Sequence, residues 1–189
     1  MQSSTLTQGQ RVLLDNLTRE LFQTEASAVR HGTREADRLG NSPPAWALRA
    51  VAQHAERVVA ELPALAERNG MIVSTGGLLT GELFSQLRDK LADMLIDSER
   101  SYRGTLLGMH HGVDVVRLLG HFADSVGNSD LSRFCSDWLD TRIALVANVE
   151  AALRWFADHA DEAAKLARTP LSRVRARLSP ARSSSLSKQ

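Results

Sequence analysis

Residues 81–126 read GELFSQLRDKLADMLIDSERSYRGTLLGMHHGVDVVRLLGHFADSV. A stripe of mostly apolar side chains runs through this segment from Phe84 to Val126, and each step along it is three or four residues. That step is the period of one helix face, whereas the side chains of a strand repeat every two residues. The segment is therefore predicted to be the central helix of an all-α protein.

This central helix is long compared with the rest of the chain. As one straight helix it would span roughly 70 Å, whereas the two helices expected before it would span roughly 50 and 40 Å. The sequence GMHHG places two glycines, Gly108 and Gly112, inside the helix, and glycine weakens a helix locally. We therefore expect the third helix to be kinked or broken near Gly108–Gly112.

Capping and turn residues bound three further helices. Gly40 ends the first, Ser42-Pro43-Pro44 begins the second, and Asn69-Gly70 ends it. Gly127-Asn128 separates the central helix from the last one. The helices expected besides the central one cover about residues 5–39, 42–68 and 130–159, with a weaker helical piece at 161–168. The predicted fold is an antiparallel four-helix bundle, and the alternative is a five- or six-helix bundle of another topology.

Length and composition favour a single soluble domain. The chain has 189 residues, of which 43% are hydrophobic and 24% charged, and it has one cysteine, Cys135. We expect Cys135 to be a small buried group in a reducing compartment. The sequence predicts neither a signal peptide nor a transmembrane segment, so the expected location is the cytoplasm. Arginine strongly outnumbers lysine, which is typical of a GC-rich bacterial genome.

Charge is distributed unevenly between the body and the C-terminal end. The sequence from residue 167 onward has no acidic residue and six basic ones: Arg168, Arg173, Arg175, Arg177, Arg182 and Lys188. We therefore predict a helical domain over residues 1–168 and a flexible Ser/Arg-rich tail over residues 169–189. Clustered positive charge on a flexible segment attracts phosphates without reading sequence. The arginines of this tail are candidates for binding nucleic acid, anionic lipid or an acidic partner, and the alternative is a solvated tail that aids solubility.

The layout resembles a known superfamily. Two hairpins of long helices, joined by a crossover connection over residues 70–80, resemble the ferritin-like four-helix bundles. Residues 110–140, HHGVDVVRLLGHFADSVGNSDLSRFCSDWLD, are similar to the later half of some bacterial ferritin-like domains. The di-iron site of these proteins needs glutamates from all four helices and a Glu-x-x-His motif on two of them. No glutamate in this chain is followed three residues later by histidine, so the resemblance implies a degenerate member without the di-iron motif.

A different metal site is one candidate for chemistry. His110 and Asp114 are four residues apart, which places both on one helix face and allows them to share a metal ion. Further ligands would have to come from another helix, for which His31, His54 and His159 are candidates. The alternative is that these polar residues bond free backbone carbonyls near the expected helix break.

A buried charge is the second candidate. Arg142 falls on or near the apolar stripe of the last helix, and a buried guanidinium needs a carboxylate partner. Glu99, Glu20 and Glu25 are the available carboxylates. An inner pair of Arg142 with Glu25 or Glu99, with Tyr102 nearby, would be a small-ligand site. The alternative is a structural ion pair, or a solvent-facing arginine whose stem is packed.

These observations favour an interaction protein over an enzyme. The sequence has no Gly-x-Ser-x-Gly nucleophile motif and no phosphate-binding glycine loop, and we predict no catalytic residues and no required cofactor. Exposed aromatic or aliphatic residues on helices, for which Trp46 is a candidate, favour self-association. We therefore expect a non-catalytic helical-bundle protein that forms a homo-oligomer and uses its basic tail on anionic partners. The alternative is a ferritin-like protein that binds a metal or small ligand at a non-standard site.

Overall fold

The computed structural model describes residues 6–71 and 98–168, and in these ranges the protein is all-α, with no strand. No helix of this part of the chain is long and apolar enough to cross a membrane. The helices are α1 (Gln8–Leu39), α2 (Pro43–Arg68), α4 (Ser98–Ser125), α5 (Ser129–Ala151), α6 (Leu153–Asp158) and α7 (Ala160–Arg168).

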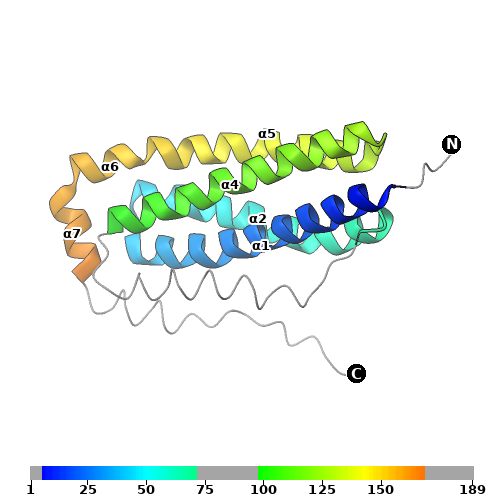
Figure 1. Cartoon of the computed structure of the whole chain (residues 1–189). Coiled ribbons are helices and arrows are strands. Elements are labelled where there is room, and N and C mark those ends of the chain that lie inside the picture. The colour runs from blue at the N-terminus through cyan, green and yellow to red at the C-terminus, as the bar shows by residue number, and fades with distance from the viewer. Residues whose placement is uncertain (1–5, 72–97, 169–189) are drawn as a thin grey trace, which may run out of the picture.

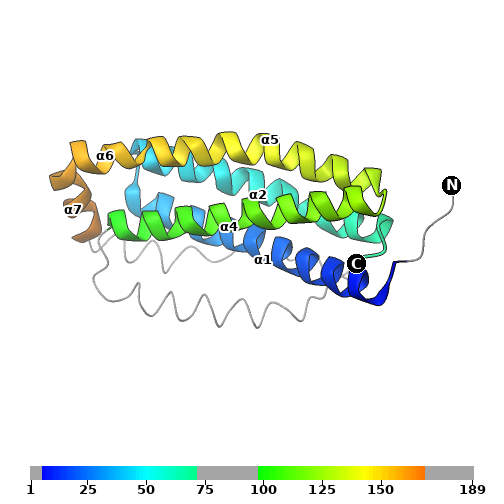
Figure 2. The same cartoon turned by 45° about the horizontal axis from the view of Figure 1, so that its top comes forward.

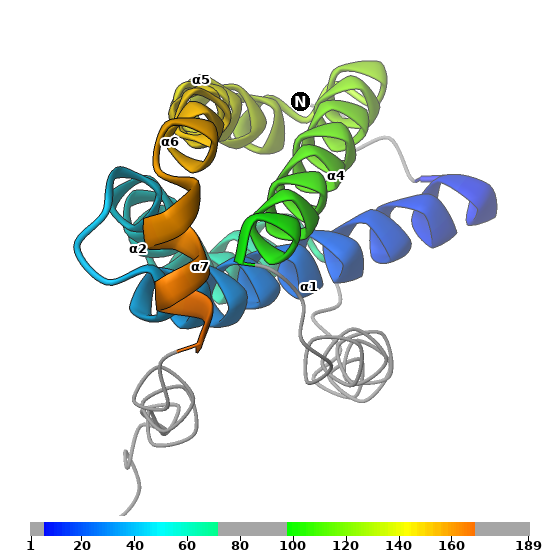
Figure 3. The ribbon, with the colours of Figure 1, turned by 90° about the vertical axis from the view of Figure 1, so that its left-hand side faces the viewer.

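The four long helices lie side by side around one apolar core. Helix α1 packs against α2 and α4, and α5 packs against the same two helices from the other side (Figure 3). Neighbouring helices run in opposite directions, and α2 ends at the opposite end of the molecule from where α4 begins (Figures 1 and 2). The short helix α7 closes one end of the core by contacting α1 and α4. Polar groups that enter the middle of this core are therefore shielded by all four long helices.

Local capping fixes most of the helix ends where the sequence predicts them. Thr7 and Gln10 form a capping box at the start of α1, with the Thr7 Oγ1 accepting from the Gln10 amide at 3.2 Å. Gly40, Gly70 and Gly127 have positive φ angles at the three turns, a backbone region that glycine adopts without strain. The predicted turns at Gly40, Asn69-Gly70 and Gly127-Asn128 are confirmed.

The third helix was predicted to be kinked or broken near Gly108–Gly112, and the break is wrong. Helix α4 is continuous through Gly108 and Gly112, while residues 81–97, the first part of the predicted helix, lie outside the described residues. Gly112 is buried, and a Cβ at this position would lie 3.7 Å from the Thr24 Cβ and 4.0 Å from the Trp138 Cη2. A side-chain carbon at this position would thus make only ordinary contacts with α1 and α5, and packing on both sides keeps the helix intact.

The predicted last helix, in contrast, is interrupted. Helix α5 ends at Ala151 and α6 begins at Leu153, although no glycine or proline marks the site. After α6, the chain turns at His159 so that α7 lies across the end of the core (Figure 3). The buried rings of Trp155 and Phe156 pack edge to face at 5.3 Å, and Phe156 also lies 5.1 Å from Tyr102 of α4. Burial of these aromatic rings holds the turn over the end of the core.

The three tryptophans and the single cysteine differ in their exposure to solvent. Trp138 and Trp155 are buried, whereas Trp46, in the first turn of α2, is 59% exposed. Cys135 is buried, as predicted, and burial raises the pKa of its thiol to about 12. The thiol is therefore protonated at neutral pH and is a poor nucleophile.

Candidate functional site

Arg142 is the most unusual residue of the interior, because a charged side chain is almost completely buried in an apolar core. It is 1% exposed and lies on the inward stripe of α5, one turn after Trp138. Its Nη2 donates to Oε2 of Glu25 on α1 at 2.6 Å, and Glu25 is fully buried. The sequence left open whether Arg142 faces inward or toward solvent; it faces inward, and of the candidate carboxylates Glu25 is its partner. This short distance is typical of a charge-assisted hydrogen bond.

A histidine from a third helix completes the contacts of the guanidinium. Nε of Arg142 donates to Nδ1 of His54 on α2 at 3.1 Å, and Nη2 lies 2.9 Å from the same nitrogen. Because a guanidinium has only donors, Nδ1 must be the acceptor and the ring proton must be on Nε2. Burial, together with the positive charges of Arg142 and Arg57, lowers the pKa of His54 to about 4. His54 is therefore neutral at physiological pH.

Trp138 covers another side of the guanidinium. The Cζ of Arg142 lies 4.7 Å from the centroid of the Trp138 ring, a cation–π distance. The ring of His54 lies 6.1 Å from the same indole in a tilted arrangement. Three of the four long helices, α1, α2 and α5, therefore contribute to this interior cluster, which we define as Glu25, His54, Trp138 and Arg142.

One acceptor and one donor of the interior cluster are left over. Burial raises the pKa of Glu25, while the charge and hydrogen bond of Arg142, and to a smaller extent the indole of Trp138, oppose that rise. The indole is thus close enough to favour the carboxylate, but it does not reach hydrogen-bond geometry. Glu25 Oε1 and Trp138 Nε1 are both buried without a hydrogen-bond partner in the described part of the chain. Most buried polar atoms of this kind are satisfied, so the pair marks a polar spot inside the core.

The other predicted ligand-binding residues lie elsewhere. Tyr102 is buried, but its hydroxyl donates to the Val149 carbonyl oxygen at 2.9 Å, and burial raises the pKa of the phenol. Glu99 lies on the surface and pairs with Arg103 on the next turn of α4. The structure thus brings together Glu25 and Arg142 but not Glu99 and Tyr102.

Sequence reasoning missed the roles of His54 and Trp138 in this cluster. His54 lies within the apolar seam of α2, three residues after Val51 and four before Val58, so it had to point inward on the same face. A polar ring in an otherwise apolar seam is a signal of the same kind as Arg142 on α5. Matching the two would have required knowing that α2 and α5 are neighbours.

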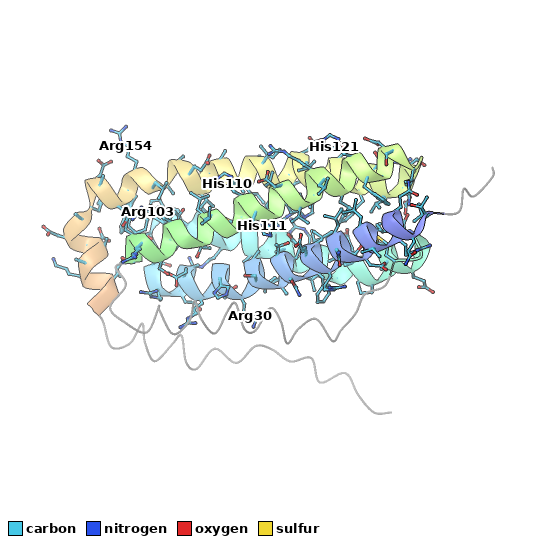
Figure 4. All side chains as sticks on the ribbon, viewed as in Figure 1. Arg30, Arg103, His110, His111, His121 and Arg154 are labelled. Carbon is cyan, nitrogen blue, oxygen red and sulfur yellow. The ribbon has the colours of Figure 1, made fainter. Side chains whose placement is uncertain are left out.

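The predicted metal ligands are engaged with separate partners. His110 Nε2 lies 3.0 Å from Glu150 Oε1 of α5, and Asp114 pairs with Arg117 at 3.2 Å on its own helix. Helix α4 carries three histidines, His110 and His111 near its middle and His121 near its end (Figure 4). Within residues 6–71 and 98–168, no three His, Cys, Asp or Glu side chains are grouped so that they could hold a metal ion.

The predicted anion-binding tail lies almost entirely outside the described residues. Arg168 is the last residue of α7, and the arginines at 173, 175, 177 and 182 follow in the part of the chain that is not described.

Comparison with known proteins adds no relative: no family model matches the sequence, and neither curated proteins nor solved structures give a significant match. The ferritin-like resemblance therefore stays a prediction from the layout of the helices.

Proposed function

We propose that this chain is a non-catalytic helical interaction protein that associates with itself. The observation that carries the proposal is the distribution of exposed apolar side chains. Of the six large hydrophobic residues exposed in the described ranges, three lie on the neighbouring helices α4 and α5: Leu107, Leu118 and Ile143. Large apolar side chains this exposed are typical of interaction surfaces when they lie on neighbouring elements.

The interior supports the same proposal. The polar side chains of the interior cluster mainly bind one another: Arg142 donates to Glu25 and His54, and its guanidinium lies over the ring of Trp138. A guanidinium in this position has no proton to give at neutral pH and accepts no hydrogen bond. We infer that the interior cluster ties helices α1, α2 and α5 together and that recognition takes place on the outside.

We further propose that the helices form an antiparallel four-helix bundle of ferritin-like layout. Two features support it: neighbouring helices run in opposite directions, and the end of α2 and the start of α4 lie at opposite ends of the molecule. A chain that joins two such ends must travel the length of the core, which is the crossover that distinguishes ferritin-like bundles from up-and-down ones.

Self-association is tested by the mass of the full chain in solution. Size-exclusion chromatography with light scattering, over a range of protein concentrations, is expected to give a mass above that of one 20.7 kDa chain. The mass should rise with concentration, because association follows mass action. A mass of one chain at every concentration would contradict the proposed function.

For the basic tail we propose sequence-independent binding to polyanions, supported by its six positive charges and lack of negative ones. Deleting residues 169–189 removes five of the six basic residues and is expected to weaken binding to duplex DNA of random sequence. The full chain should bind less tightly as salt rises, and the truncated chain should show a flatter salt dependence. Fluorescence anisotropy at several salt concentrations measures both, and the absence of binding by the full chain at low salt would refute the proposal.

The unpartnered Glu25 Oε1 and Trp138 Nε1 favour a second candidate function, the binding of a small polar ligand or metal inside the core. A polar ligand would accept from the indole N–H and contact the free carboxylate oxygen, whereas a metal ion could bind only the carboxylate oxygen. Elemental analysis of protein purified without chelator separates the metal form of this candidate from the interaction protein. A near-stoichiometric metal content would favour this second candidate.

A further inference from the structure

The outward face of α4 carries a short seam of its own, separate from the face that packs on the core. It consists of Leu107, His111, Asp114 and Leu118, with steps of four, three and four residues. All four are exposed: Leu107 by 72%, Leu118 by 48%, and Asp114 by 72% of its side chain. Steps of four and three are those of the contact positions of a two-stranded coiled coil. We refer to these residues as the α4 seam.

The order of residues in the α4 seam is self-complementary. When two identical helices pack antiparallel about a two-fold axis, each residue faces a residue equally far on the other side of the axis. An axis between residues 112 and 113 brings Leu107 of one copy against Leu118 of the other. The same axis brings His111 against Asp114. One register therefore matches leucine with leucine and an imidazole with a carboxylate, and it does so twice.

We propose that the partner of the α4 seam is a second copy of this chain, bound antiparallel through α4 about a two-fold axis between residues 112 and 113. This inference rests on the proposed self-association and names its surface and register. Apolar contact between the leucines supplies the attraction, and the His111–Asp114 contacts select the register. A parallel pair would instead place His111 on His111 and Asp114 on Asp114.

Charges beside the α4 seam are compatible with this pairing. Arg103, His110 and Arg117 flank it, and identical copies would bring these basic groups near one another. Each, however, already has a carboxylate of its own chain. The pairs are Arg103 with Glu99, His110 with Glu150 at 3.0 Å, and Arg117 with Asp114 at 3.2 Å. Because one helix face buries less area than a standard interface, we expect a dissociation constant of about micromolar.

The test uses two single variants and their combination in the full chain. Leu107→Glu and Leu118→Arg each place a charge against leucine at both symmetric contacts. Each is expected to weaken association about 100-fold. In the double variant Leu107→Glu/Leu118→Arg, the new acid of one copy faces the new base of the other, so most of the association should return. An equimolar mixture of the two single variants should also associate more tightly than either alone.

Sedimentation velocity over a concentration series measures all four proteins, with Trp46→Glu as the matched control. Trp46 is also an exposed apolar residue, but it lies on α2, across the core from α4 (Figure 3). Its substitution should leave association unchanged, and circular dichroism should show the same helix content for every variant. Wild-type protein that stays monomeric would refute both the inference and the proposed function. Wild-type association with undiminished association of the single variants, or no recovery in the double variant, would refute the α4 seam alone.

Discussion

Replacing Arg142 with methionine is expected to lower the free energy of unfolding by about 3–5 kcal/mol, the usual cost of breaking a buried ion pair from one side. The substitution removes the donor that satisfies Glu25 Oε2 at 2.6 Å and His54 Nδ1 at 3.1 Å. Glu25 is fully buried and would have to hold its carboxylate without a counter-charge or take up a proton. Either outcome disfavours the folded state. Urea unfolding of the full chain at pH 7, followed by circular dichroism, measures the change.

The matched control is Arg154→Met, which removes an arginine from an exposed ion pair. Arg154 lies on α6 and pairs with Asp158 at 3.3 Å, and its side chain is 85% exposed (Figure 4). Exposed pairs of this spacing contribute little to stability, so this variant should unfold close to the wild type. If Arg142→Met cost no more than Arg154→Met, the interior cluster would not be important for stability.

A second variant distinguishes an uncompensated charge from simple loss of packing. In Glu25→Leu/Arg142→Met, both charges are replaced by apolar side chains of similar size. Buried ion pairs replaced in this way often give proteins as stable as the original, because the desolvation cost of both charges disappears. We therefore expect the double variant to be clearly more stable than Arg142→Met alone. Equal instability of the two variants would show that the guanidinium acts by filling space.

The sequence carried enough information to find half of the interior cluster. A charged residue on the apolar stripe of α5 requires a buried acid, and this reasoning reached Arg142 and a short set of carboxylates that included Glu25. The choice of Glu25 over Glu99 could not be made, because it depends on which helices are neighbours. Glu99 turned outward with α4, one turn from Arg103, whereas Glu25 lies on the face of α1 that meets the core.

Helix interruptions were harder to predict than helix ends. Glycine inside a helix has two different effects: it weakens the helix, and it can allow another helix to approach closely. At Gly112 the helix stays continuous, and a Cβ there would make only ordinary contacts with Thr24 and Trp138, so the packing of α4 against α1 and α5 outweighs the weakening effect of glycine. At Ala152 the helix ends although no glycine or proline is present. Trp155 and Phe156 are buried just after this interruption, and their burial depends on tertiary contacts that local sequence does not reveal. Local sequence therefore predicts the turns that contain glycine, but it does not predict where tertiary packing overrides the helix propensity of a residue.

The neutral state of His54 gives the interior cluster a defined dependence on pH. The unfolded chain binds a proton at His54 below about pH 6.5, whereas in the folded protein the pKa of this residue is about 4. Between these values the unfolded state holds more protons, so acidification favours unfolding. The contribution of His54 to stability is complete above pH 6.5 and is lost as the pH falls to 4. A difference of this size corresponds to about 3 kcal/mol.

The variant His54→Asn isolates this contribution. An asparagine oxygen can accept from Arg142 in place of Nδ1, but it takes up no proton in this range. The stability of the variant should therefore fall less on acidification than that of the wild type, by up to about 3 kcal/mol between pH 7 and pH 4. Urea unfolding at four or five pH values measures both proteins.

Carboxylates also titrate in this pH range, and comparing the variant with the wild type cancels their contributions to stability. Glu25 faces the same guanidinium, and its raised pKa acts with the opposite sign, because its carboxyl takes up a proton more readily in the folded state as the pH falls. Both Glu25 and the surface acid Asp130, whose pKa is lowered mainly by its hydrogen bond from Asn69, are present in the wild type and in the variant. The difference between the two pH profiles therefore reports His54. The exposed-histidine variant His121→Asn should follow the wild-type profile, and a His54→Asn profile parallel to it would show that burial and the charge of Arg142 do not keep His54 neutral.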